Sequence, residues 1–213
     1  LQVAALAEIS FAESDPFNRS EKRSLESIRH LLTPADLSKQ SGNQLLQAKS
    51  LEKLSELYQV LSRSAESINF SEQALDVYKK LNFKKGIAET LNSIGTAYEN
   101  VGEYQKALNL YEQALQNWKD IGDKHGEAIA LNNIGLHCYR TGDLSKALDY
   151  FDRVLPIWEG TGDWISMANT FSAMGLAYSS LSENQKAISY FNEALPLQHL
   201  AGDCRSEAST LNN

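Results

Sequence analysis

The chain has 213 residues, of which 42% are hydrophobic and 22% charged, as is typical of folded globular proteins. Its net charge of −7 disfavours nucleic-acid partners, and no apolar run reaches the roughly 18 residues of a membrane-spanning helix. Two cysteines, Cys138 and Cys204, are too few for a disulfide framework, so we expect a cytoplasmic protein.

The first 45 residues lack the pattern of the rest of the chain. Residues 1–14 and 19–32 each have helical character, and the turn-favouring run 15–18 joins them. Residues 33–43 have the composition of a longer connection. We therefore expect an irregular N-terminal helical pair and connector over 1–45.

From residue 46 onward the sequence repeats every 40 residues. Three full blocks cover 86–125, 126–165 and 166–205, after a degenerate block at 46–85 and before the start of a truncated block at 206–213. Small residues recur in register in the full blocks: Ala88, Ala128, Ala168; Gly95, Gly135, Gly175; Ala107, Ala147, Ala187. A fixed period of this length indicates a solenoid, in which each unit packs on its neighbours and presents a long surface for binding.

Each full block has two helical patterns separated by a tight turn. In the block 126–165, apolar residues follow the spacing of one helix face on both sides of Thr141-Gly142-Asp143. Gly142 can take the left-handed conformation that ends a helix, and Asp143 can cap the next one.

The recurring small residues have a predicted packing role. Gly135 and Ala147 stand where the two helices of a block approach closely, with Phe151 filling the space beside them. We expect the same structural role at each repeat, for Gly95, Gly135 and Gly175 and for Ala107, Ala147 and Ala187.

The residues that recur resemble the tetratricopeptide repeat (TPR). In the second full block the matching positions are Leu131, Ile134, Gly135, Cys138, Ala147, Phe151 and Val154. The 40-residue period is similar to the long-helix variety of kinesin light chains and of cyanobacterial arrays, which often precede a caspase-like protease or another effector domain. The resemblance implies an all-α fold, a right-handed superhelical solenoid of antiparallel helix-turn-helix hairpins.

In this family the first helices of the hairpins line a concave face that binds peptides. The corresponding positions in this chain are found by counting from each repeat glycine. They give the candidate peptide-binding residues Asn92, Asn132, Asn133, Leu136, Tyr139, Arg140 and Asn212. The degenerate block places Glu52, Lys53 and Glu56 at the same positions, and Ser93 follows Asn92. An asparagine amide donates and accepts hydrogen bonds, so it can hold the main chain of an extended peptide. The alternative is that these amides brace the neighbouring helix.

Catalytic and metal-binding patterns are poor. His137 and Cys138 are consecutive on a helix and so point about 100° apart, which excludes a dyad, and Cys138 is at a packing position. Asp123, Asp163 and Asp203 recur every 40 residues as turn and cap residues. We expect no enzymatic activity, no cofactor and no metal.

We therefore expect a protein–protein interaction scaffold that binds a peptide or helix of a partner, with no nucleic-acid or membrane partner. Two alternatives stay open: the sensing or autoinhibitory arm of a larger enzyme such as a caspase-like protease, and a peptide-pheromone receptor that regulates transcription. The sequence stops inside a first helix, so we expect a longer parent protein and self-association through the open C-terminal end.

Overall fold

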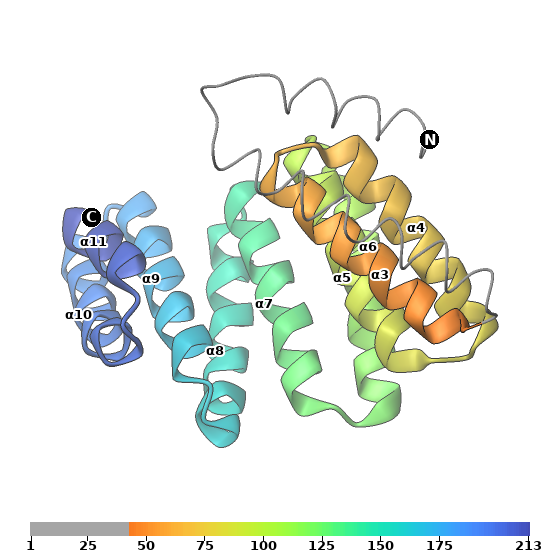
Figure 1. Cartoon of the computed structure of the whole chain (residues 1–213). Coiled ribbons are helices and arrows are strands. Elements are labelled where there is room, and N and C mark those ends of the chain that lie inside the picture. The colour runs from red at the N-terminus through yellow and green to blue at the C-terminus, as the bar shows by residue number, and fades with distance from the viewer. Residues whose placement is uncertain (1–42) are drawn as a thin grey trace. The chain divides into compact units, whose positions relative to one another are not determined.

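The computed structural model describes residues 43–213, and the expected N-terminal helical pair lies outside that range. Over the described residues the chain folds into nine helices without a strand, as Figure 1 shows. This confirms the all-α class of consecutive helix hairpins. The helices are α3 Gln44–Val60, α4 Ser64–Lys80, α5 Lys84–Asn100, α6 Tyr104–Ile121, α7 Lys124–Arg140, α8 Leu144–Thr161, α9 Trp164–Ser180, α10 Asn184–Ala201 and α11 Cys204–Asn212.

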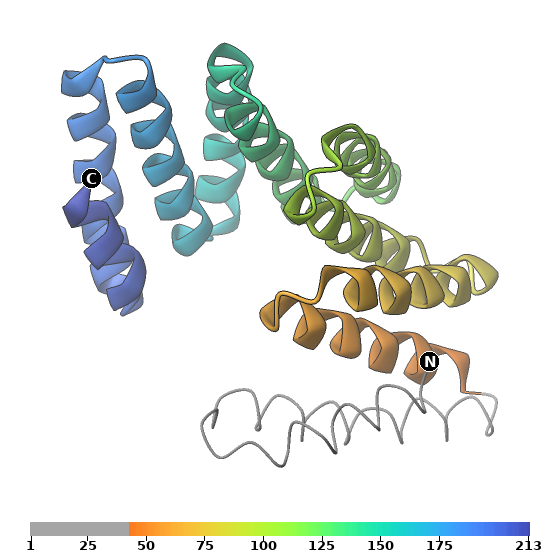
Figure 2. The same cartoon turned by 90° about the horizontal axis from the view of Figure 1, so that it is seen from above.

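The helices belong to two compact units, divided between Asn117 and Trp118 within α6. In the first unit, α3 packs on α4 and α4 packs on α5. In the second, α7 packs on α8, α8 on α9, α9 on α10 and α10 on α11, an order that can be followed in Figure 2. Neighbouring first helices also touch within each unit, α3 with α5 and α7 with α9.

Tight turns join the helices as the sequence predicts. Gly142 has φ = 86°, the left-handed conformation that a glycine adopts without steric cost. Ser182, one block later, takes φ = 61° at the same position. The Asp143 carboxylate accepts a 3.3 Å hydrogen bond from the backbone N–H of Lys146 and so caps α8.

The close approach of the two helices in a hairpin depends on the repeat glycine. A β-carbon on Gly135 would lie 2.7 Å from Cε1 of Phe151, closer than real carbon atoms approach. Ala147 and Phe151 are fully buried at this crossing. Equivalent clashes would follow at Gly95 with Tyr111 and at Gly175 with Phe191. The pair of small residue and aromatic ring therefore sets the distance between the helices.

Candidate functional site

Asn132 bonds to the next hairpin. Its Oδ1 accepts a 3.2 Å hydrogen bond from the Thr170 hydroxyl, so the amide links α7 to α9. The equivalent residue one block later, Ser172, lies 3.1 Å from the hydroxyl of Thr210. For Asn132, the contact with Thr170 favours the bracing role that the sequence left open as the alternative.

The same link occurs in the first unit with a carboxylate. Glu52 accepts hydrogen bonds from Thr90 Oγ1 at 3.0 Å and from the Tyr78 hydroxyl at 2.5 Å. Burial raises the pKa of Glu52 above its ordinary value, although both hydrogen bonds act in the opposite direction. Burial and the neighbouring carboxylate also raise the pKa of Tyr78.

A residue of the second helix completes each link. Tyr78 plays this part in the first unit, Trp158 donates to Thr170 at 3.1 Å, and Gln198 donates to Ser172 at 3.0 Å. These three-residue links were not predicted from the sequence. Their signal is the recurrence of threonine at 90, 170 and 210 in the same register.

Two other predicted asparagines differ sharply in exposure. Asn92 is only 7% exposed, and its Oδ1 has no hydrogen-bond partner among the described residues. Its Oδ1 is therefore buried away from the surface. Asn212 on α11 is exposed.

The remaining candidates gather along α7. Asn133, Leu136 and Tyr139 are half-buried and Arg140 is exposed. Their spacing of three and four residues places them along one side of the helix. They combine an amide, an apolar side chain, a ring and a cation, which together can hold the main chain and select the side chains of a peptide.

The first unit has a polar pocket on its first helices, with a volume of about 440 Å³. It includes Glu52, Lys53, Glu56 and Ser93. Counting from the repeat glycines predicted that these four residues lie on the inward side of the first helices. The pocket is lined by Lys49, Glu52, Lys53, Ser55, Glu56, Ser71, Glu89 and Ser93. Most of these side chains come from α3 and α5, so two successive hairpins share the site.

Charges of both signs surround this pocket. The Lys53 ammonium lies 2.5 Å from a Glu56 carboxylate oxygen, and both side chains are more than half exposed. At the pocket floor the Ser55 hydroxyl lies 2.6 Å from that of Ser71 and donates a 2.9 Å hydrogen bond to the backbone oxygen of Ser67. The pocket thus offers donors and acceptors at a solvent-facing rim above a hydroxyl floor whose hydrogen bonds are made internally.

The acidic residues that recur every block have a structural role. The carboxylates of Asp123, Asp163 and Asp203 each accept from the backbone N–H three residues ahead, at 2.9 to 3.0 Å, which confirms the capping prediction. Burial raises the pKa of Asp163, but hydrogen bonds from Ser166 and His125 outweigh burial and lower it overall.

Within residues 43–213, no three His, Cys, Asp or Glu side chains are placed to hold a metal ion. Over the same range, no helix combines the length and apolar character that would let it cross a membrane. Cys138 is buried in α7, where the sequence placed it at a packing position, whereas Cys204 is exposed.

Helix hairpins of similar length, with a small residue at each crossing (Ser55, Gly95, Gly135 and Gly175), define a helical repeat protein. The sequence matches the tetratricopeptide repeat family over residues 86–160 and 127–199, which together cover more than half of the chain. The chain therefore belongs to the tetratricopeptide repeat family. No curated protein matches it.

Solved structures share the fold at low sequence identity. A Rap protein complexed with Competence and Sporulation Factor is 21% identical, with a TM-score of 0.75 over 84% of this chain and 50% of that one. The Rap conjugation gene regulator of plasmid pLS20, in complex with a Phr peptide, is 18% identical, with a TM-score of 0.71 over 92% and 60%. A putative kinesin light chain from Podospora anserina is 15% identical, with a TM-score of 0.66 over 86% and 90%. The chain thus spans less than two thirds of each Rap protein.

Proposed function

We propose that this chain is a cytoplasmic protein-interaction module that binds an extended peptide segment of a partner on its first helices. The observation that carries the proposal is the polar pocket of about 440 Å³ between α3 and α5. Its rim residues come from two successive hairpins, as a ligand running across the repeats requires. Solvent-exposed side chains of both charges around a concave pocket, such as the Lys53–Glu56 pair, are features of a recognition site.

The proposed ligand contacts differ between the two units. In the first unit, Lys53 and Glu56 form the exposed edge of the pocket and would bind charged side chains of the peptide. In the second unit, Tyr139 and Arg140 lie at the C-terminal end of α7 and would select an apolar or acidic side chain. Asn132 and Glu52 would act indirectly, because their hydrogen bonds hold neighbouring first helices together.

Affinity capture from the source cells tests the proposal. The bait is the full chain, compared with a Tyr139→Ala/Arg140→Glu variant and with a Lys53→Glu/Glu56→Lys variant whose net charge is unchanged. Asn132 is left intact, so that the link to Thr170 is preserved. A partner bound by the native chain and lost with either variant supports the first-helix surface. Equal capture by all three chains refutes it.

A peptide-receptor role is the second candidate. Two of the similar folds were solved as complexes, one with Competence and Sporulation Factor and one with a Phr peptide. If this chain has such a role, its ligand is a short free peptide and not a segment of a folded protein. Mass spectrometry of the molecules released from the captured chain distinguishes a short free peptide from a segment of a folded protein.

A further inference from the structure

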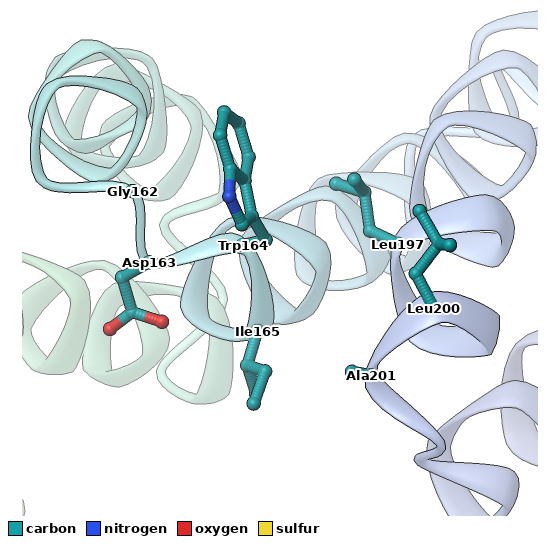
Figure 3. Close-up of a pocket in the computed structure, with 7 residues that line it drawn as sticks. All are labelled: Gly162, Asp163, Trp164, Ile165, Leu197, Leu200 and Ala201. Carbon is teal, nitrogen blue, oxygen red and sulfur yellow. The ribbon is translucent and has the colours of Figure 1, made fainter.

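An apolar pocket of about 520 Å³ lies in the second unit, between the start of α9 and the end of α10. Figure 3 shows Trp164 and Ile165 on the first turn of α9, with Leu197, Leu200 and Ala201 facing them from the last turns of α10. The turn residues Gly162 and Asp163 complete the lining. Trp164 and Ile165 begin the first helix α9, but no lining residue is among the binding residues proposed above on α3, α5 and α7. The volume is in the range of small-ligand and side-chain pockets.

The apolar side chains at this pocket do not serve the core. Trp164 is 51% exposed, Ile165 52% and Leu200 83%. The other two tryptophans, Trp118 and Trp158, are 3% and 1% exposed and fill the interior of their hairpins. Exposed apolar residues that cluster around a cavity mark an interaction site more often than scattered ones do.

Comparison between repeats shows that the fold does not require these residues. The two positions of Trp164 and Ile165 hold Lys124 and His125 one block earlier and Cys204 and Arg205 one block later. The position of Leu200 holds Gly160 in one preceding block and Asp120 in the block before it. The same hairpin thus forms with polar residues elsewhere, and the apolar pocket is specific to the third full block.

The surroundings of the pocket are acidic. In the segments that adjoin it, 159–165 and 197–207, four carboxylates, Glu159, Asp163, Asp203 and Glu207, stand against one arginine, Arg205. Asp163 lies in the pocket wall itself, and Asp203 and Glu207 follow the end of α10. Two of these carboxylates lie beside a histidine, Asp163 at 3.1 Å from His125 Nε2 and Glu207 at 3.2 Å from His199 Nδ1. A ligand that brings positive charge beside an apolar group would complement this environment.

We propose that this pocket is a second docking site, which takes a large apolar side chain of a partner peptide flanked by lysine or arginine. The apolar side chain would enter between Trp164 and Leu200, where it would exchange water for contact on both helices. The basic flank would lie over the acidic turns. This pocket shares no residue with the binding residues proposed on α3, α5 and α7, so an experiment can refute either proposal without refuting the other.

A displayed library of random twelve-residue peptides tests this site, with the full chain as target. The variant is Leu200→Asn, and the control is Ile188→Asn, which removes another exposed apolar side chain of α10, 53% exposed against 83% for Leu200, away from the pocket. Circular dichroism confirms that both variants fold. We expect selected peptides to combine Leu, Phe or Trp with Lys or Arg, and to lose about tenfold or more in affinity for Leu200→Asn only.

Two further measurements complete the test. Binding should shift the emission of Trp164, because it is the exposed tryptophan of the described chain, and replacing the basic residues of a selected peptide with Glu should weaken it. Selection of acidic or wholly polar peptides, equal affinity for both variants, or no selected peptide overturns the proposal. It is also overturned if the native chain self-associates in sedimentation and Leu200→Asn abolishes this, since the occupant is then a second copy.

Discussion

The indole Nε1 of Trp158 donates a 3.1 Å hydrogen bond to Oγ1 of Thr170 and so joins α8 to α9. Both residues are buried, at 1% and 0% exposure. Thr170→Ala should therefore lower the free energy of unfolding by roughly 1–3 kcal/mol, because it leaves a buried donor without a partner. Urea unfolding followed by circular dichroism measures this loss. Thr170→Ser keeps the hydroxyl and should recover most of it; an equal loss in both variants would contradict the role of the hydrogen bond.

The equivalent pair one block earlier lacks this bond. Trp118 is buried and its Nε1 has no hydrogen-bond partner among the described residues, and Ala130 stands where Thr170 supplies the hydroxyl. Ala130→Thr should raise the free energy of unfolding by about 1 kcal/mol by giving the indole an acceptor. Ala130→Val has the same shape without the hydroxyl and separates hydrogen bonding from packing. A valine as stabilising as the threonine would rule out the hydrogen bond as the cause.

The glycine at the hairpin crossing should tolerate no side chain. Gly135→Ala places a carbon 2.7 Å from the Phe151 ring, so the helices must separate or the ring must move. We expect a loss of roughly 1–3 kcal/mol in the free energy of unfolding from overpacking. Trimming the ring in Gly135→Ala/Phe151→Leu should restore part of it. A double variant that is as unstable as the sum of the two single variants would show that the clash lies elsewhere.

The raised pKa of Glu52 predicts a pH dependence of stability. The folded chain holds the Glu52 proton more tightly than the unfolded chain does, so this residue lowers the free energy of unfolding as pH rises from its ordinary pKa through the raised one. Glu52→Gln cannot titrate, so its stability relative to the native chain should increase over that window. Unfolding in urea at a series of pH values measures the difference, and parallel profiles would contradict it.

The hairpin architecture could be predicted from the sequence because it depends on local features that recur. The glycine at the crossings of the three full blocks, the left-handed turn at Gly142 and the aspartate caps all act within one or two helices. The division into two units at Asn117 could not be predicted, because the repeat register runs through it without interruption.

The site was only partly predictable. Counting from the repeat glycine found Lys53, Glu56 and Ser93, which do line the polar pocket. It also selected Asn92 and Asn132, because counting gives the side of a helix but not what lies opposite. The residue opposite determines what the side chain contacts: the Thr170 hydroxyl, for example, donates a hydrogen bond to the Asn132 amide oxygen. The exposed Trp164 was missed because tryptophan is usually read as core.

Site-specific photo-crosslinking tests the central claim, that the first helices bind the partner. A photoreactive residue replaces Glu56 of α3 or Arg140 of α7 on the proposed surface, and exposed Asp76 of α4 or Asp149 of α8 as controls on second helices. The chain is irradiated in extract of its source cells. We predict that the same partner crosslinks at Glu56 or Arg140 and at neither control position. A partner that crosslinks only at Asp76 or Asp149 would show that binding takes place on the second helices and would contradict the proposed function.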